Sequence, residues 1–244
     1  MVFKNRKNNP PHICITSLYC YPLFNPAVHT PFGGTEVRIA LIAKELARRG
    51  RFRISLIVGD HGTPHIEQRE GVTLYTFVGR AIWGVCPTVD QSCPKLNWSR
   101  CLIGQIQRKI DVLKLKIPGF SPLAGQIGSY VITPKMIGIY DEVGADVYIM
   151  PGNSYFSAEM AFYTRQRRKK FVFLSGSDFD YFPEYKKYPD RTDMYGSPFS
   201  LKTYAIENAD AHIVQSERQA ALLKDGYDRT GIVIKNPIDV NPNF

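Results

Sequence analysis

The chain has 244 residues, of which 44% are hydrophobic, and it carries a formal net charge of +9 at pH 7. The hydrophobic share is ordinary for a globular protein and excludes a largely disordered chain. No apolar run approaches the roughly 18–20 residues of a membrane span, and residues 1–11 lack the apolar core of a secretory signal, so we expect a cytoplasmic protein. The charge suits an anionic substrate or membrane surface, whereas no zinc-finger, RRM-like or basic-zipper pattern predicts a nucleic-acid partner.

The five cysteines predict neither a disulfide framework nor a metal site. Their number is odd, and no two are spaced as Cys-x-x-Cys. Cys14 falls within the first predicted strand, where a small buried thiol is typical. We therefore expect no bound metal.

The first third of the chain predicts a strand, a helix and two further strands. Residues 12–17 are apolar without a clean alternation, which is typical of a strand buried on both faces. In residues 35–49, hydrophobic side chains recur at helical spacing and Gly50 follows the last turn, so we predict a helix there. Residues 53–58 and 72–77 are predicted strands, separated by the turn-rich segment 59–71.

Residues 79–126 predict an irregular insertion that contains a basic helix. From Leu102 to Ile117, hydrophobic side chains at intervals of three and four residues share one helix face. Such a helix either packs on the sheet or lies at an anionic membrane surface, on the inner face of the plasma membrane. In the second case, the membrane contacts would be Trp98, Arg100, Arg108, Lys109, Lys114 and Lys116. A further helix is predicted over residues 127–143.

The second half alternates strands and helices. Strands are predicted over residues 147–150, 171–174, 211–214 and 232–234, and helices over 155–168, 199–209 and 216–226. This alternation predicts an α/β fold, a Rossmann-like parallel sheet with helices on both faces. Such sheets bind ligands at the carboxyl ends of their strands, so residues 20–34, 151–153, 175–180 and 215–216 are expected along one edge.

A pair of glycines precedes the first predicted helix, in the run Phe32-Gly33-Gly34-Thr35-Glu36. Glycine lets the backbone approach a ligand closely, and the start of a helix leaves amide N–H groups without an intrahelical partner. Together with the helix dipole, these amides form a seat for an anion such as a phosphate. The alternative is that the two glycines only mark the turn before the helix.

Five segments together resemble a known family. They are residues 33–50, which begin with Gly33-Gly34-Thr35-Glu36, and residues 140–148, 170–178, 209–219 and 232–239. In their order and spacing they resemble the N-terminal domain of GT-B glycosyltransferases of family 4. The resemblance covers nearly the whole chain outside residues 79–126.

This resemblance implies a domain organisation and an activity. In the family, a first Rossmann-like domain holds mainly the acceptor and a second holds mainly the nucleotide-sugar. Residues 1–237 would be the first domain and 238–244 the start of the interdomain linker, with the donor-binding C-terminal domain absent from this chain and supplied in cis or in trans. The implied reaction needs no metal or cofactor and transfers a sugar from a nucleotide-sugar donor to a glycan or lipid-linked acceptor, in bacterial surface polysaccharide synthesis. We expect little or no transfer by this chain alone.

The resemblance also implies roles for individual residues. The amides of Gly33, Gly34 and Thr35 would face the donor phosphates. The acceptor would lie against Asn153, Ser175, Gly176, Ser177 and Asp178. The catalytic candidates are Asp178 and Asp180, which could bind or deprotonate an acceptor hydroxyl. Their alternative role is local, because aspartate accepts hydrogen bonds from loop amides and stabilises turns. Many family members carry a histidine in this loop, where this chain has Ser-Gly-Ser-Asp.

Two functions of other classes stay open at this point. The chain could be a non-catalytic membrane-docking or scaffold subunit of a split glycosyltransferase. It could also be a nucleotide-dependent α/β enzyme such as a dehydrogenase, although the first strand is not followed by Gly-x-Gly-x-x-Gly.

Overall fold

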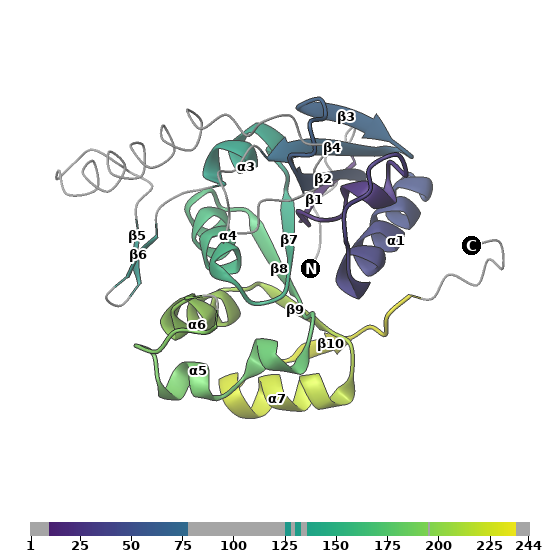
Figure 1. Ribbon diagram of the computed structural model, residues 1–244. Helices are drawn as coiled ribbons and strands as arrows, with labels where there is room; N and C mark the ends of the chain where they lie inside the picture. The colour runs from purple at the N-terminus through teal and green to yellow at the C-terminus, as the bar shows by residue number, and fades with distance from the viewer. Residues whose placement is uncertain (1–9, 78–124, 128–129, 133–135, 195, 238–244) are drawn as a thin grey trace, which may run out of the picture.

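The computed structural model describes residues 10–77, 125–127, 130–132, 136–194 and 196–237 (Figure 1). An eight-stranded sheet runs in the order β10-β9-β8-β7-β1-β2-β4-β3. Its strands are β1 (His12–Thr16), β2 (Arg53–Gly59), β3 (Ile66–Arg69), β4 (Val72–Phe77), β7 (Val147–Pro151), β8 (Lys170–Leu174), β9 (Ala211–Val214) and β10 (Gly231–Val233). Every neighbouring pair is parallel except β3 and β4. The predicted α/β fold is thus confirmed, with one antiparallel strand added at the edge.

Helices cover both faces of this sheet, with α1 on one side and α3 and α4 on the other (Figure 1). The α-helices are α1 (Gly34–Arg48), α3 (Ile137–Val143), α4 (Tyr155–Gln166), α5 (Glu184–Lys187), α6 (Phe199–Glu207) and α7 (Glu217–Tyr227). Two short 3-10 helices, η1 (Tyr21–Leu23) and η3 (Asp178–Tyr181), lie in loops. Successive strand residues point to opposite faces, so Cys14 packs with α3 and α4 whereas Ile15 packs with α1.

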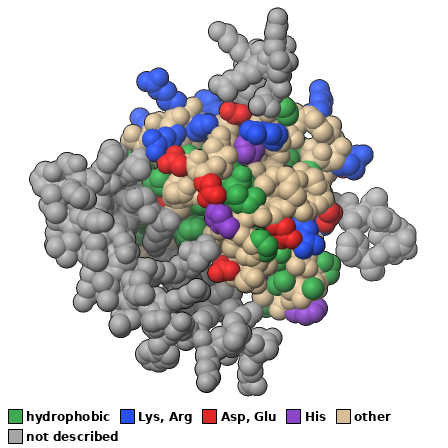
Figure 2. All heavy atoms as spheres, turned by 90° about the horizontal axis from the view of Figure 1, so that it is seen from above, with side chains coloured by type: hydrophobic (Ala, Val, Ile, Leu, Met, Phe, Trp, Pro, Cys, Tyr) green, Lys and Arg blue, Asp and Glu red, His purple; other side chains and the backbone are tan. Residues whose placement is uncertain are grey.

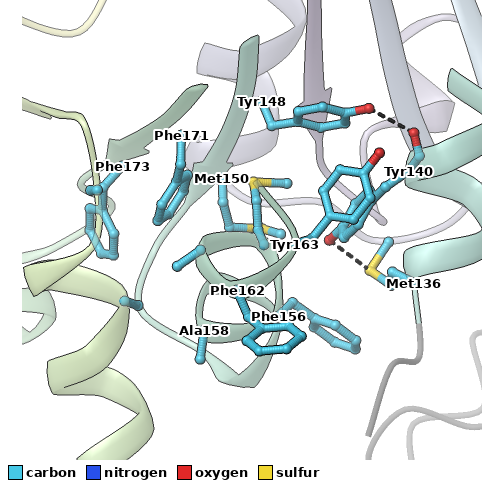
Figure 3. Close-up of a cluster of buried hydrophobic side chains, with 14 of the residues drawn as sticks. Met136, Tyr140, Tyr148, Met150, Phe156, Ala158, Phe162, Tyr163, Phe171 and Phe173 are labelled. Carbon is cyan, nitrogen blue, oxygen red and sulfur yellow. Dashed lines mark hydrogen bonds between the residues drawn. The ribbon is translucent and has the colours of Figure 1, made fainter. Parts of the chain in front are cut away.

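The larger of the two cores is rich in tyrosine and phenylalanine (Figure 3). Buried phenol groups need hydrogen-bond partners, and these have them. The Tyr148 hydroxyl donates to the Tyr140 carbonyl oxygen over 2.7 Å and accepts from the Ala145 amide over 2.9 Å. Burial raises the pKa of Tyr163 to about 12 and that of Tyr140 well above its ordinary value, so these phenols stay neutral.

The helix predicted over residues 127–143 is wrong in its first half. There β5 (Gly125–Ile127) pairs with β6 (Tyr130–Ile132) as a separate antiparallel hairpin, and α3 begins only at Ile137. The sequence gives the physical reason. Val131 and Ile132 are β-branched residues that favour strands, and Pro134 is incompatible with the interior of a helix.

Three further elements fall where the sequence predicted only turns or a polar loop. Strand β3 lies within the turn-rich segment 59–71 and forms a hairpin with β4, joined by Glu70 and Gly71, which both have positive φ. The helices η3 and α5 lie in the loop after β8. The other strands and helices that were predicted within the described residues are present, with ends that differ by no more than two residues.

Within the described ranges, no helix is both long and apolar enough to cross a bilayer. The insertion predicted over residues 79–126 lies outside these ranges apart from the start of β5, as does the predicted linker 238–244.

Candidate functional site

Gly33 and Gly34, at the start of α1, form an exposed turn at the carboxyl edge of the sheet. Gly33 is the N-cap, in extended conformation, and Gly34 is the first residue of the helix. The Gly33 amide donates to the Glu36 carboxylate over 2.8 Å, so an acidic side chain already occupies this amide. The amides of Gly34 and Thr35 lie in the first turn, where a helix has no carbonyl partner to offer them. A Cβ added at Gly34 would meet nothing within 4 Å. Of the three predicted phosphate-binding amides, these two are therefore the open ones.

The turn lies against the loops that follow β7 and β8. A Cβ added at Gly176 would lie 3.8 Å from the Thr35 hydroxyl oxygen, 3.8 Å from the Gly152 Cα and 3.6 Å from an Asp180 carboxylate oxygen. Three segments that are far apart in the sequence therefore meet at one point. We call residues 33–35, 152–153 and 175–180 the strand-end site.

Asp180 joins two of these loops through its carboxylate. One oxygen accepts from the Asn153 amide over 2.9 Å, and the other accepts from the amides of Gly176 and Ser177 over 2.6 and 3.0 Å. Burial raises the pKa of Asp180 above its ordinary value, and these amide hydrogen bonds act in the opposite direction. These contacts fit the local role, in which Asp180 stabilises the loops. They do not favour the catalytic role of Asp180, which stays a prediction.

Asn153 is buried beside Asp180 and is held by its side-chain amide. Its Nδ2 donates to the carbonyl oxygens of Asp180 and Lys202, over 2.9 and 3.3 Å. Lys202 in turn donates to the Asn153 carbonyl oxygen over 2.6 Å and forms an ion pair with Asp193. Within the described residues, the buried Asn153 Oδ1 atom has no hydrogen-bond partner, so one acceptor of the site is left unsatisfied.

Asp178 lies at the rim of the same site and is more accessible than Asp180. Its side chain is 39% exposed and forms an ion pair with Arg218 over 3.0 Å. Ser177 beside it is exposed, whereas Ser175 is buried and donates to the Ser177 carbonyl oxygen. Of the two predicted catalytic carboxylates, Asp178 is the one that a ligand can reach.

Arg38, which lies one turn into α1, was not among the predicted site residues. Its Nη1 donates to the Ser175 carbonyl oxygen over 2.8 Å, and the Gln215 side chain donates to the same oxygen over 2.7 Å. The residue is only 4% exposed, and burial lowers the pKa of its guanidinium. The sequence contains one signal for this role. Arg38 lies in the first turns of the predicted helix, after the glycine turn and directly before the apolar stripe that begins at Ile39.

Basic and acidic side chains are interspersed over the described part of the molecule, as on the face in Figure 2. Basic and acidic residues are nearly equal in number there, so almost all of the excess positive charge falls in the sequence outside it. The predicted membrane contacts Trp98, Arg100, Arg108, Lys109, Lys114 and Lys116 belong to that remainder, and their role stays a prediction.

Two hollows in the surface of the described residues lie away from this site. One, of about 410 Å³, lies between the end of α4 and the start of β8, at the opposite edge of the sheet from the strand-end site, and Arg168, Lys169 and Asp210 are among its lining residues. Another, of about 170 Å³, lies between α5 and α6. No predicted site residue lines either hollow. Among the described side chains, no group of three or more His, Cys, Asp or Glu is placed to hold a metal ion.

No family model matches the chain, and no curated protein matches it in sequence. Among solved structures, it is similar to a UDP-glucosyltransferase from Polygonum tinctorium, with 12% identity and a TM-score of 0.43 over 94% of this chain and 52% of that one. It is also similar to alpha,alpha-trehalose 6-phosphate synthase from Burkholderia multivorans, with 11% identity and a TM-score of 0.42 over 95% and 48%. UGT89C1 of Arabidopsis thaliana, solved with UDP, matches with 10% identity and a TM-score of 0.40 over 85% and 43%.

At these identities the likeness concerns the fold alone. The chain spans about half the length of the structures that it matches.

Proposed function

We propose that this chain is the acceptor-side domain of a glycosyltransferase of the GT-B type, similar to family 4, which acts together with a separate donor-binding domain. The observation that supports this proposal best is that Thr35 and Gly152 both approach Gly176 at the carboxyl ends of parallel strands, each 3.8 Å from the position that a Cβ on Gly176 would take. Parallel α/β sheets bind their ligands at this edge. The substrates would be a nucleotide-sugar and a glycan or lipid-linked acceptor, as the resemblance in sequence implies.

In this proposal, the open amides of Gly34 and Thr35 receive the diphosphate of the donor. Negative charge grows on the diphosphate as its bond to the sugar breaks, and N–H groups aimed at that charge lower the barrier. A helix terminus contributes about 0.3–1 kcal/mol to an exposed charge and up to roughly 2 kcal/mol in a partly buried site. Since this is a small part of a typical enzymatic acceleration, the remaining stabilisation must come from the donor domain.

The acceptor would lie against the β7 and β8 loops. The free Asn153 Oδ1 can accept from one acceptor hydroxyl, and the accessible Asp178 carboxylate can accept from another. As the acceptor oxygen bonds to the sugar and the bond to the diphosphate breaks, the hydroxyl proton passes to a base. Asp178 is the proposed base, because the carboxylate of Asp180 is engaged by three backbone amides.

Hydrophobic side chains exposed beside the site favour a facing domain. Phe32 and Val37 flank the start of α1 and are 48% and 37% exposed, and Phe179 in η3 is 69% exposed. Neighbouring exposed apolar side chains are typical of an interaction surface. This agrees with a site that a second domain completes.

The role of the Gly34 amide can be tested with a matched pair of variants. Gly34→Pro removes the N–H at the first position of the helix, where proline is well tolerated, and the extended Gly33 before it is compatible with proline. Gly34→Ala keeps the N–H. We expect UDP-glucose, titrated calorimetrically, to bind Gly34→Ala like the parent chain and Gly34→Pro about tenfold or more weakly, since a hydrogen bond to a charged group contributes about 1.5–3 kcal/mol. Equal binding by both variants would contradict the proposal.

A further inference from the structure

Arg38 is a buried charged residue without a counterion among the described residues. Its side chain is 96% buried, as its 4% exposure shows, and only Nη1 has a partner, the Ser175 carbonyl oxygen. Its Nε and Nη2 atoms are buried and make no hydrogen bond to any described residue. Removing an ion from water costs several kcal/mol unless an opposite charge and hydrogen bonds compensate.

The acidic side chains near Arg38 are already engaged elsewhere. No ion pair with a described residue is formed by Arg38. The Glu36 carboxylate accepts from the Gly33 amide, and both Asp180 oxygens accept from backbone amides. The protein therefore supplies a buried positive charge in the described structure without supplying its counterion.

The position of the guanidinium indicates where the missing anion would bind. Arg38 is four residues after Gly34 and three after Thr35, so all three share one side of α1, and a helical side chain leans toward the N-terminus of its helix. Nη1 reaches Ser175, the residue before Gly176, and Gly176 lies beside the Thr35 hydroxyl. The unpaired N–H groups of Arg38 and the open amides of Gly34 and Thr35 thus belong to the same end of the helix.

We propose that Arg38 is the charged ligand of an oxyanion that binds at the start of α1, a phosphate or diphosphate group held by its Nε and Nη2 together with the amides of Gly34 and Thr35. Guanidinium groups bind phosphate oxygens through parallel hydrogen bonds. This inference deepens the proposed function and rests on its site. The group would be either the diphosphate of the donor or a phosphate on the acceptor, and the two sources share the same recognition chemistry.

The test compares Arg38→Met with Arg48→Met in the full chain. Arg48 lies in the last turn of the same helix and is exposed, so both variants lose one positive charge from α1. We expect pyrophosphate to bind Arg38→Met at least tenfold more weakly than the parent and to bind Arg48→Met normally. Because a buried charge without a counterion is replaced by an apolar side chain, the melting temperature of Arg38→Met without ligand should be no lower than that of Arg48→Met.

Two results would overturn the inference. One is equal affinity of the parent and Arg38→Met for pyrophosphate. The other is a failure of pyrophosphate to shift the Arg38 Nε–H resonance in the NMR spectrum of the parent chain, a measurement that needs no variant. UDP and α-glucose 1-phosphate are titrated separately into the parent chain. If only UDP binds, the donor is the source of the group; if only α-glucose 1-phosphate binds, a phosphate on the acceptor is the source. If pyrophosphate binding depends on Arg38 but UDP-glucose does not bind, the oxyanion site stands and the proposed donor role fails.

Discussion

The guanidinium of Arg38 on α1 donates to the carbonyl oxygen of Ser175 at the end of β8, across 2.8 Å. These residues are 137 positions apart in the chain, and their contact ties the start of the first helix to the loop after a strand on the other side of β1. The contact lies beside Gly176, where the β8 loop approaches the Thr35 side chain.

Asp180→Asn should destabilise the fold. A neutral amide in place of the carboxylate cannot accept from all three backbone amides, and each buried donor left unpaired costs about 1–3 kcal/mol. Urea unfolding should therefore show a loss of this order or greater. The control is Asp178→Asn, at an accessible position, where we expect a change within about 0.5 kcal/mol. Equal stability of the two variants would show that Asp180 does not organise the loops.

Gly176→Ala should fold normally but bind ligand less well. The added Cβ would make ordinary contacts of 3.6–3.8 Å with its neighbours, and Gly176 does not have the positive φ that alanine disfavours. The methyl group would nevertheless stand between Thr35, Gly152 and Asp180, in the space that the proposal assigns to substrate. We expect an unchanged melting temperature and weaker UDP-glucose binding. Unaltered binding would mean that the ligand does not approach this point.

Tyr148→Phe should cost about 1–3 kcal/mol in the free energy of unfolding. The Tyr148 hydroxyl donates to the Tyr140 carbonyl (Figure 3) and accepts from the Ala145 amide. Phenylalanine leaves the buried Ala145 amide without this partner, whereas the Tyr140 carbonyl keeps its hydrogen bond from the Gly144 amide. Tyr19→Phe, at a residue that is 40% exposed, is the control and should be nearly neutral. Chemical denaturation of the two variants checks the difference.

Stability should fall as the pH drops from about 6.5 to about 4. Burial lowers the pKa of both His12 and His212 to about 4, against an unfolded value near 6.5. In this window the unfolded chain binds more protons than the folded one, so each histidine can lower the free energy of unfolding by up to about 1.4 kcal/mol per pH unit. Above pH 6.5 both states are neutral at these positions and the effect disappears.

Unfolding measured at several pH values tests this dependence. His61, whose pKa burial also lowers, adds to the same trend. Replacing His12 and His212 by glutamine should flatten the curve between pH 5 and 6.5, where few carboxylates titrate. A curve that keeps its slope in the double variant would assign the dependence to other groups.

The sequence predicted the parts of this fold that local patterns determine. Residues 12–17, 53–58 and 171–174 are apolar runs of strand length, and the helix behind Gly34 has both a regular stripe and a terminal glycine. Strand β3 escaped prediction because it is an exposed edge strand whose side chains, Ile66 to Arg69, show little apolar pattern. Its existence depends on pairing with β4 rather than on its own composition.

The site was predictable only where strand ends determine it. The rule that parallel strands end at one edge places residues 20–34, 151–153, 175–180 and 215–216 along that edge. In the structure the last two of the first range, Gly33 and Gly34, lie next to Thr35, which approaches Gly152 and Gly176. The sequence could not show that Asp180 is engaged by amides from two loops, since those contacts join residues up to 27 positions apart. Nor could it show that Arg38 is buried without a counterion, because a charged residue in a helix is ordinarily solvated.

The most direct test of the account is to add UDP to the isotopically labelled chain and map the backbone amide signals by NMR. We predict that the largest shifts fall on Gly34, Thr35 and Gly176, the residues that meet at the start of α1. Shifts confined to the basic hollow around Arg168 and Lys169, or no shifts at millimolar UDP, would contradict a nucleotide-diphosphate site at the strand ends.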